Sequence, residues 1–288
     1  RTHIFEPSTS PPASHVTDSV TTASFNDADA LRRFAADVDV ITYEFENIPT
    51  STLDILETIC PIRPGRRALS ISQDRLIEKE FLNELGLKTA PYANVTCTSE
   101  ALQAANDIGT PSILKTRRMG YDGKGQIRLE TKADMPGAWD TMQGAASVLE
   151  GFINFSHEIS VIAARGVDGQ VACYDPSENV HRAGILHSST VPANLSAAQR
   201  MDAIFLSANI LNALEYVGVM GVELFVTPTG FIVNEIAPRV HNSGHWTQNG
   251  CDICQFEQHI RAVAGWPLAD GARHSDIRME NLIGTDIE

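Results

Sequence analysis

The chain has 288 residues, of which 43% are hydrophobic and 20% are charged, and its formal net charge at pH 7 is −14. This length exceeds the usual size of a single core, so it predicts two or three domains. The negative charge argues against nucleic acid as a partner, because phosphate backbones require a basic face, and no apolar run approaches the roughly 20 residues of a membrane span.

The first predicted elements in chain order are short strands of a parallel α/β sheet. THIFEP (residues 2–7) has a strand pattern, and Val38–Thr42 is β-branched and apolar. Ligands of such sheets bind beyond the carboxyl ends of the strands. Glu44 and Glu46 follow the second strand at such an end, although each would also suit a solvated loop.

Helices are predicted next, followed by antiparallel strands. One helix runs from a Ser72 cap to a stop at Gly86, and a second from Ser99 to Gly109. Further elements are predicted as strands at 112–115, 126–130, 147–153 and 157–175, a long helix at 196–216, a hairpin at 217–239, a final helix at 251–264 and a strand from 277. The change from parallel to antiparallel patterns predicts a Rossmann-like front domain followed by α+β lobes.

The hairpin carries the clearest chemical signal. Pro228 and Gly230 suit a three-residue loop, in which Thr227 pairs with Phe231. That register places Glu223 directly opposite Glu235, with the side chains about 5 Å apart. Two such carboxylates repel each other, so either one is protonated or a cation lies between them. Magnesium fits, because it prefers oxygen ligands and keeps phosphates and waters in its shell.

A second signal is the stretch KTRRMGYDGKGQ, residues 115–126. Its glycines allow backbone N–H groups to turn toward an anion, and Lys115 and Lys124 add positive charge. The glycines connect two strands, so the stretch predicts a flap over phosphates rather than a loop that caps a helix. Exposed loop lysines alone explain it nearly as well; the nearby carboxylate pair favours the phosphate interpretation.

Two metal alternatives arise from histidine and cysteine. Glu235, His241 and His245 could bind zinc in a hydrolase, but Arg239 would lie beside the cation. Cys251 and Cys254 form a lone CxxC without the second ligand pair of a structural zinc site. The odd, scattered cysteines indicate no disulfide framework and suit a reducing cytoplasm.

Several stretches together resemble a known family. TYEFENIP (42–49), residues 73–92, KTRRMGYDGKGQ, residues 150–166, residues 217–250 with NEIAPRVHNSGHWTQ, and residues 255–268 are similar to the N5-carboxyaminoimidazole ribonucleotide synthetases. These are ATP-dependent carboxylases of de novo purine biosynthesis in the ATP-grasp superfamily. The resemblance implies a partial pre-ATP-grasp domain at 1–70, an ATP-grasp domain at 71–264, and the start of a C-terminal domain at 265–288. Within the second, it implies a flap-bearing lobe at about 99–163 and a metal-binding lobe at about 164–264.

The resemblance also implies the site residues. ATP would be bound by phosphate contacts, a flap, an adenine-binding hinge strand and ribose contacts: Arg75, Lys115, Gly120, Tyr121, Asp122, Gly123, Lys124, Gly125, Gln126, Glu150, Gly151, Phe152, Ile153, Glu158, His181, Asn234 and Glu235. Glu223 and Glu235 would hold Mg²⁺, with Mn²⁺ as an alternative. Arg239 would orient bicarbonate, and the carboxylation pocket would add Glu44, Tyr121, Asp122, Lys124, His241 and Asn242.

The implied reaction converts 5-aminoimidazole ribonucleotide to its N5-carboxy form through carboxyphosphate, which ATP and bicarbonate generate. The expected assembly is a cytoplasmic homodimer that supplies a carboxyaminoimidazole ribonucleotide mutase. Relative to the family, we expect an opening strand with a glycine-rich turn, and most of a C-terminal domain, to be absent. The alternatives are another ATP-grasp ligase, of the formate-dependent glycinamide ribonucleotide or biotin carboxylase type, and a nucleotide-binding fragment without turnover.

Overall fold

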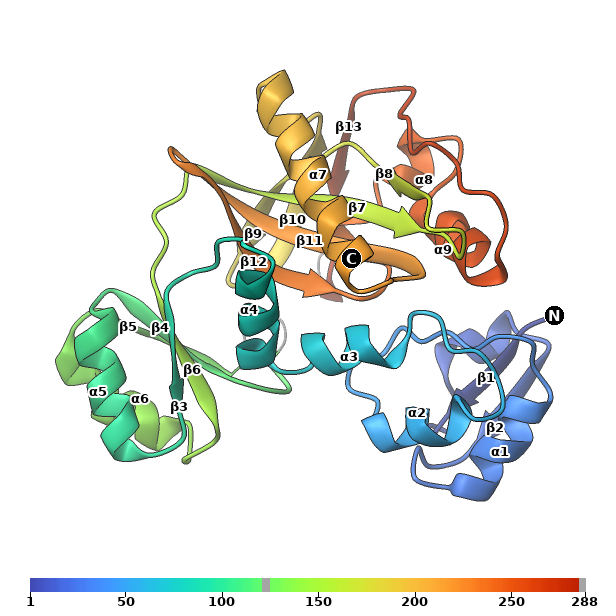
Figure 1. The fold of residues 1–288 in the computed structure, drawn as a ribbon, viewed down its shortest axis with the longest axis horizontal. Helices are drawn as coiled ribbons and strands as arrows, with labels where there is room; N and C mark the ends of the chain where they lie inside the picture. Colours follow the sequence, from blue (N-terminus) through green and yellow to red (C-terminus); the bar gives the residue numbers. More distant parts are fainter. Residues whose placement is uncertain (121–124, 285–288) are drawn as a thin grey trace.

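A computed structural model of the chain describes residues 1–120 and 125–284. In these residues the strands form three sheets, of two, four and seven strands. Figure 1 shows each sheet in its own body, with helix α4 (Arg75–Glu84) between them. The architecture therefore combines a front α/β body with two antiparallel bodies, as the sequence predicts.

The front body is small and mostly helical. Its β1 and β2 pair in parallel, and Leu31, Phe34 and Leu53 lie in its core. The strand expected at Val38–Thr42 is wrong, since only Ile41 forms a bridge, to Ile62. The segment around Ile62, with which such a strand would pair, contains prolines, and proline has no backbone N–H to donate to a ladder of hydrogen bonds. The elements are β1 (His3–Glu6), a 3₁₀ helix (Pro12–His15), β2 (Ser19–Thr22), α1 (Ala28–Ala36), α2 (Thr50–Leu56) and α3 (Arg66–Ser72).

The start of α4 differs from the prediction. Ser72 is the last residue of α3, and Asp74 caps α4 by accepting a hydrogen bond from the Leu76 amide. The carboxylate of Asp74 also pairs with Arg117 at 2.7 Å and with Arg118 at 3.3 Å. Two of the cations that follow Lys115 therefore anchor the start of the expected flap to α4.

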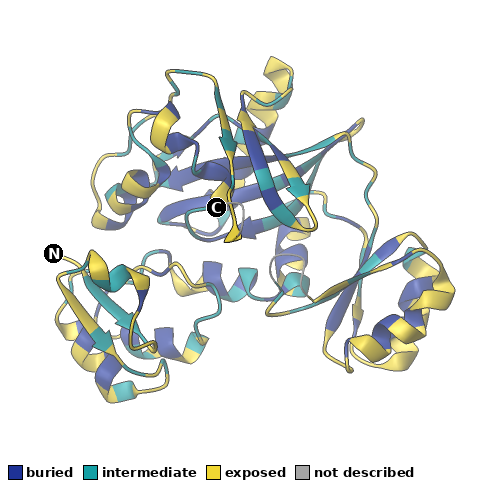
Figure 2. Cartoon of the chain, turned by 180° about the vertical axis from the view of Figure 1, so that it is seen from behind, coloured by how far each residue is buried: buried dark blue, intermediate teal, exposed yellow. Residues whose placement is uncertain are grey.

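The four-stranded sheet has the order β3-β6-β4-β5, and two helices cover one of its faces. Leu114 packs under these helices, whereas its neighbours Ile113 and Lys115 line a cavity on the other face. Figure 2 shows the outer sides of the helices exposed. The elements are β3 (Tyr92–Val95), α5 (Thr98–Ile108), β4 (Ser112–Thr116), β5 (Gln126–Leu129), a 3₁₀ helix (Lys132–Asp134), α6 (Met135–Thr141) and β6 (Ser147–Gly151).

The large sheet has the order β12-β11-β7-β9-β10-β13, with β8 beside β7. Ile159, Val161 and Ala163 of β7 pack against α7 and α4, while the alternate residues Ile162 and Ala164 pack toward Trp246. Its strands are β7 (His157–Arg165), β8 (Val171–Cys173), β9 (Ser177–Arg182), β10 (Ile185–Val191), β11 (Gly218–Thr227), β12 (Gly230–Ala237) and β13 (Ile277–Glu280). Its helices are α7 (Ala197–Ala213), a 3₁₀ turn (Asn242–Gly244), α8 (Thr247–Gly250) and α9 (Gln255–Ala264).

Some expected boundaries do not match the sheets. A lobe boundary at 163/164 would fall inside β7, and β13, from the expected C-terminal domain, pairs with β10 of the large sheet. The helix expected at 251–264 begins only at Gln255, because Cys251 forms a bridge with Arg273. Within residues 1–120 and 125–284, none of the helices has the length and apolarity that a membrane span requires.

Candidate active site

A cavity of about 420 Å³ lies between the four-stranded sheet and the large sheet. One wall comes from β4 and β5, and the other from β7, β9, β10, β11 and β12. The loop after β12 and Glu46 of the front body close one end. All three bodies of the molecule therefore contribute to a single cavity.

The hairpin that carries the acidic pair contains a bulge. Thr227 pairs with Gly230, so the loop has two residues and the predicted Thr227–Phe231 pairing is wrong. The register then shifts by one residue between Leu224 and Glu223, which restores Glu223 directly opposite Glu235. A bulge places two residues of one strand against one of its partner. Strict alternation along the strand would place Asn234 on the face opposite Glu235; because of the shift, its side-chain amide instead donates a hydrogen bond to Glu223 at 3.3 Å.

The two carboxylates of the hairpin have different electrostatic surroundings. Burial and the negative charge of Glu235 raise the pKa of Glu223 to about 7. Burial acts on Glu235 as well, but the positive charges of Arg75 and Lys115 outweigh it and lower the pKa of Glu235. The Glu235 side chain is 38% exposed and Arg75 lies 3.3 Å from it. One carboxylate is thus held ionised while the other gains a proton easily.

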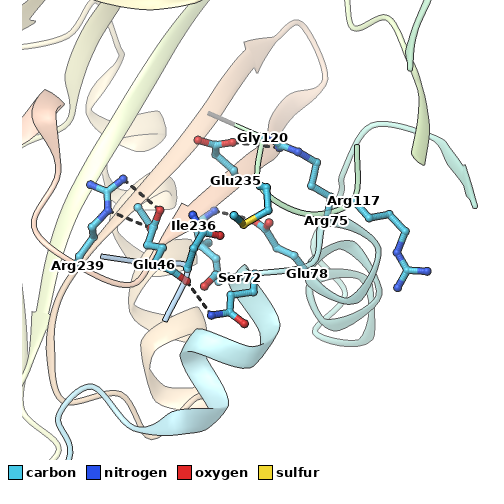
Figure 3. A pocket seen from close by; sticks show the side chains of 13 residues that line it. Glu46, Ser72, Arg75, Glu78, Arg117, Gly120, Glu235, Ile236 and Arg239 are labelled. Atoms are coloured by element: carbon cyan, nitrogen blue, oxygen red, sulfur yellow. Dashed lines mark hydrogen bonds and ion pairs between the residues drawn. The ribbon is translucent and has the colours of Figure 1, made fainter. Parts of the chain in front are cut away.

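A smaller polar recess of about 90 Å³ shares lining residues with the main cavity and lies toward the front body. Figure 3 shows its two ion pairs, Arg75 with Glu235 and Glu46 with Arg239. Arg239 Nε lies 3.1 Å from Glu46 Oε1. Burial raises the pKa of Glu46, and Arg239 opposes this shift. Glu46 therefore fixes the guanidinium of Arg239 at the edge of the cavity.

The residues after Arg239 continue the polar end of the cavity. His241 Nε2 lies 3.6 Å from Glu223 Oε1, and its Nδ1 is 2.8 Å from Ser243 Oγ. Burial and the charge of Arg239 lower the pKa of His241 to about 4, so the imidazole is neutral at neutral pH. Asn242 lines the cavity beside it. This loop offers neutral hydrogen-bonding groups next to one fixed cation.

The opposite end of the cavity is largely apolar. The rings of Phe155 and Phe225 stack with centroids 4.6 Å apart, and Phe152 is also part of the lining. Between this end and the acidic pair, His181 Nδ1 lies 2.9 Å from Glu158 Oε2, and this carboxylate raises the pKa of His181. The cavity thus runs from aromatic rings, past a polar pair, to cations and carboxylates.

Most of the predicted site residues meet here. The cavity is lined by Arg75, Lys115, Gly120, Gln126, Phe152, Glu158, His181, Glu223, Asn234, Glu235, Arg239, His241 and Asn242. Glu44 is exposed and is not part of the lining, whereas Glu46, two residues later, is. Gly125, Glu150, Gly151 and Ile153 are also outside the lining. Tyr121, Asp122, Gly123 and Lys124 lie outside the described residues.

Gly125 nevertheless has a clear conformational requirement. Its φ is +68°, and a Cβ there would lie 2.6 Å from Thr116 Oγ1. Any other residue would therefore strain the backbone and clash at the base of β5.

The sequence analysis did not predict two buried ionisable side chains beside the cavity, Glu78 and Lys79. Glu78 accepts a hydrogen bond from the Ile236 amide at 2.7 Å, and Lys79 Nζ lies 3.2 Å from Glu150 Oε1. The sequence did indicate that Glu78 is buried, because Glu78 lies one helical turn before Leu82 on the apolar face of α4. Glu150 was expected among the ATP-binding residues, but its buried side chain forms ion pairs with both Lys79 and Lys115.

Neither zinc alternative has a ligand set in the part of the chain that the structure describes. Among residues 1–120 and 125–284, no group of three or more His, Cys, Asp and Glu side chains is arranged to hold a metal ion. His245 packs against the ring of Phe256, with centroids 5.5 Å apart, and Cys251 is buried. The acidic hairpin pair is a different type of site, because magnesium takes further ligands from phosphates and water.

Comparisons with known proteins agree with the fold. The ATP-grasp domain family matches residues 80–256, and the ribonucleotide synthetase preATP-grasp domain matches residues 1–73. N5-carboxyaminoimidazole ribonucleotide synthase of Brucella melitensis is 51% identical over 292 aligned positions, which cover 100% of this chain and 80% of the relative.

Solved structures of N5-carboxyaminoimidazole ribonucleotide synthetases superpose on this chain over almost its whole length. The synthetase from Thermus thermophilus superposes with a TM-score of 0.92 at 39% identity, over 98% of this chain and 76% of that one. The synthase from Aspergillus clavatus, in complex with ADP and 5-aminoimidazole ribonucleotide, gives a TM-score of 0.91 at 28% identity, over 99% and 77%. This chain belongs to the ATP-grasp superfamily and, within it, to the N5-carboxyaminoimidazole ribonucleotide synthase family of ligases.

Proposed function

We propose that this chain carboxylates 5-aminoimidazole ribonucleotide on its exocyclic amine, using ATP and bicarbonate, in de novo purine biosynthesis. The observation that carries the proposal is the composition of one cavity. It brings together aromatic rings, the cations Arg75 and Lys115, an acidic pair and the Arg239 loop. The reaction requires these groups side by side, since a nucleotide must meet bicarbonate and an amine in a space that excludes water.

ATP would lie along the length of the cavity. The base would occupy the aromatic end at Phe152, Phe155 and Phe225, and the ribose hydroxyls would reach Glu158 beside His181. The phosphates would then lie near Lys115 and Arg75, the cations that face the acidic pair. Phosphoryl transfer needs little covalent help from the protein, so positioning and charge neutralisation provide most of the catalysis.

A divalent ion would be held by Glu223 and Glu235, and Mg²⁺ is our choice, with Mn²⁺ as a substitute. The raised pKa of Glu223 is what a buried carboxylate shows beside another negative charge. The amide of Asn234, brought to the same face by the bulge, also points at Glu223. When bound there, the ion would offset the negative charge of the triphosphate tail.

The carboxylation step would take place around Arg239. Bicarbonate would attack the γ-phosphate, so that ADP leaves and carboxyphosphate forms. Carboxyphosphate would break down to CO₂ and phosphate, and the exocyclic amine would attack the CO₂ carbon to form the N–C bond, while its proton passes to the released phosphate. Arg239, fixed by Glu46, would orient bicarbonate, and neutral His241 and Asn242 would border the amine. Glu46 takes the place that we first expected for Glu44. Tyr121, Asp122 and Lys124 would complete this pocket from the expected flap.

Three finer expectations belong to the same proposal. The chain would act as a homodimer in the cytoplasm, and its product would pass to a carboxyaminoimidazole ribonucleotide mutase. The free cysteines of the described residues suit a reducing compartment.

The proposal is tested by measuring ADP and phosphate release with different substrates. We expect release to require bicarbonate and to rise with 5-aminoimidazole ribonucleotide. Equal stimulation by formate and glycinamide ribonucleotide would instead assign the chain to another ATP-grasp ligase. Magnesium-dependent ATP binding without turnover on any of these substrates would identify a nucleotide-binding fragment.

A further inference from the structure

Behind the phosphate end of the cavity, two lysines share one buried carboxylate. Lys115 Nζ lies 2.9 Å from Glu150 Oε2, and Lys79 Nζ lies 3.2 Å from Glu150 Oε1. The side chains of Lys79 and Glu150 are only 4% and 6% exposed. Lys115 lines the cavity, whereas the other two lie behind it. The three residues come from α4, β4 and β6, so the cluster joins two bodies of the molecule.

With both lysines protonated, the cluster has one more positive than negative charge; burial lowers the pKa of Lys79, and the negative charge of Glu150 opposes this shift. Burial raises the pKa of Glu150, but the ammonium groups of Lys115 and Lys79 outweigh this effect and hold the pKa below its usual value. Glu150 is therefore ionised at neutral pH. A buried carboxylate that loses its only counter-ion is strongly destabilised. With one lysine alone, Glu150 would oppose any movement of that lysine toward a ligand.

To bind phosphate, Lys115 must either move away from Glu150 or divide its hydrogen bonds between Glu150 and the phosphate oxygens. An ammonium that bonds to phosphate oxygens must weaken its contact with Glu150, since Nζ has only three protons to donate. Lys79 is too deeply buried to reach the ligand, but it contacts the other oxygen of the same carboxylate. Glu150 thus keeps a counter-ion when Lys115 turns away.

We propose that Lys79 is a positioning residue for nucleotide binding: by remaining paired with Glu150, it allows Lys115 to exchange that carboxylate for the phosphates of ATP. The inference rests on the proposed function, because it takes Lys115 as a phosphate ligand. It assigns a role to a side chain that never touches the nucleotide.

This role differs from ordinary stabilisation of the core. In Lys79→Met the side chain has a similar length and no charge, and Lys115 still satisfies Glu150 when no ligand is present. The variant should therefore fold, and its defect should emerge only when phosphates compete for Lys115. The double variant Lys79→Met/Glu150→Gln should regain binding, because a neutral amide does not retain the Lys115 ammonium.

The test is isothermal titration calorimetry with two probes, the ATP analogue AMP-PNP with MgCl₂, and adenosine, which has no phosphates. We expect Lys79→Met to weaken AMP-PNP binding about 10-fold or more and to leave adenosine binding unchanged. Lys79→Arg and the double variant should both restore AMP-PNP binding. Lys132→Met is the matched control, because it removes an exposed lysine that lines neither cavity. Lys79→Gln replaces Lys79→Met if the latter is insoluble.

The outcomes separate this inference from the proposed function. Wild-type protein that binds no AMP-PNP would refute both. Wild-type binding with unchanged affinity in Lys79→Met would overturn this inference alone. So would an equal loss for AMP-PNP and adenosine, which indicates general damage, or a double variant as weak as the single one.

Discussion

His259 of α9 makes the stability of the fold depend on pH. Its Nδ1 accepts a hydrogen bond from the Val219 amide at 3.0 Å, so the proton is on Nε2, which lies 2.8 Å from Thr42 Oγ1 in the front body. The residue is 7% exposed, and burial lowers the pKa of His259 to about 4. The neutral ring thus joins the large sheet to the loop that leads to Glu46.

The sign and size of the effect follow from these values. Because the folded pKa lies below the unfolded value of 6.5, the unfolded chain binds more protons between pH 6.5 and 4, and stability falls as the pH drops through this range. The difference of roughly 2.5 pKa units corresponds to about 3 kcal/mol, which is fully present above pH 6.5 and lost below pH 4.

The measurement compares urea unfolding of the wild type with that of His259→Gln at several pH values from 7.5 to 4. Glutamine can accept and donate hydrogen bonds but does not titrate. Other histidines titrate equally in both proteins, so the difference between the two curves isolates His259. We expect the advantage of the wild type to shrink by about 3 kcal/mol between pH 7.5 and pH 4. A constant difference across this range would refute the reasoning.

Three substitutions test the catalytic cavity. Glu235→Gln should retain the circular dichroism spectrum of the wild type but release no ADP, because the acidic pair loses a charge that binds the divalent ion. ADP release at the wild-type rate would show that Glu235 is not part of the metal site. Glu46→Gln should lower kcat/KM for bicarbonate about 10-fold or more, because Arg239 loses its charged partner and hydrogen bonds to charged groups contribute about 1.5–3 kcal/mol. An unchanged kcat/KM would show that Glu46 does not fix Arg239. Phe155→Ala should raise KM for ATP without affecting KM for bicarbonate, because it removes the ring stacked on Phe225; equal increases in both would contradict the placement of the base.

The sequence predicted the acidic pair, but by a register that the structure corrects. The Thr227–Phe231 pairing assumed a three-residue loop, whereas the loop has two residues and a bulge at Asn234 restores the alignment. Hairpin periodicity fixes which residues share a face only if the strands are regular. A bulge depends on packing against neighbouring strands, which a single sequence does not reveal.

Charges in the interior were the hardest to predict. Lys115 and Glu150 were both expected in the ATP site, but the ion pair between their side chains was not predicted, and Lys79 was not considered. Similarly, Asp74 rather than Ser72 caps α4, because Asp74 also binds Arg117 and Arg118 from a distant segment. Helix periodicity identifies apolar faces well, whereas a buried ion pair is determined by residues far apart in the chain.

Glu223 and Glu235 are expected to bind one divalent ion together at the triphosphate of ATP. The most direct measurement is a crystal structure with Mn²⁺ and AMP-PNP, with data collected to reveal the anomalous signal of manganese. We expect one anomalous peak between these two carboxylates, within bonding distance of both and of the phosphate oxygens. If the nucleotide is bound but the ion lies elsewhere, or if the two carboxylates point away from each other, then Glu223 and Glu235 do not bind the ion together.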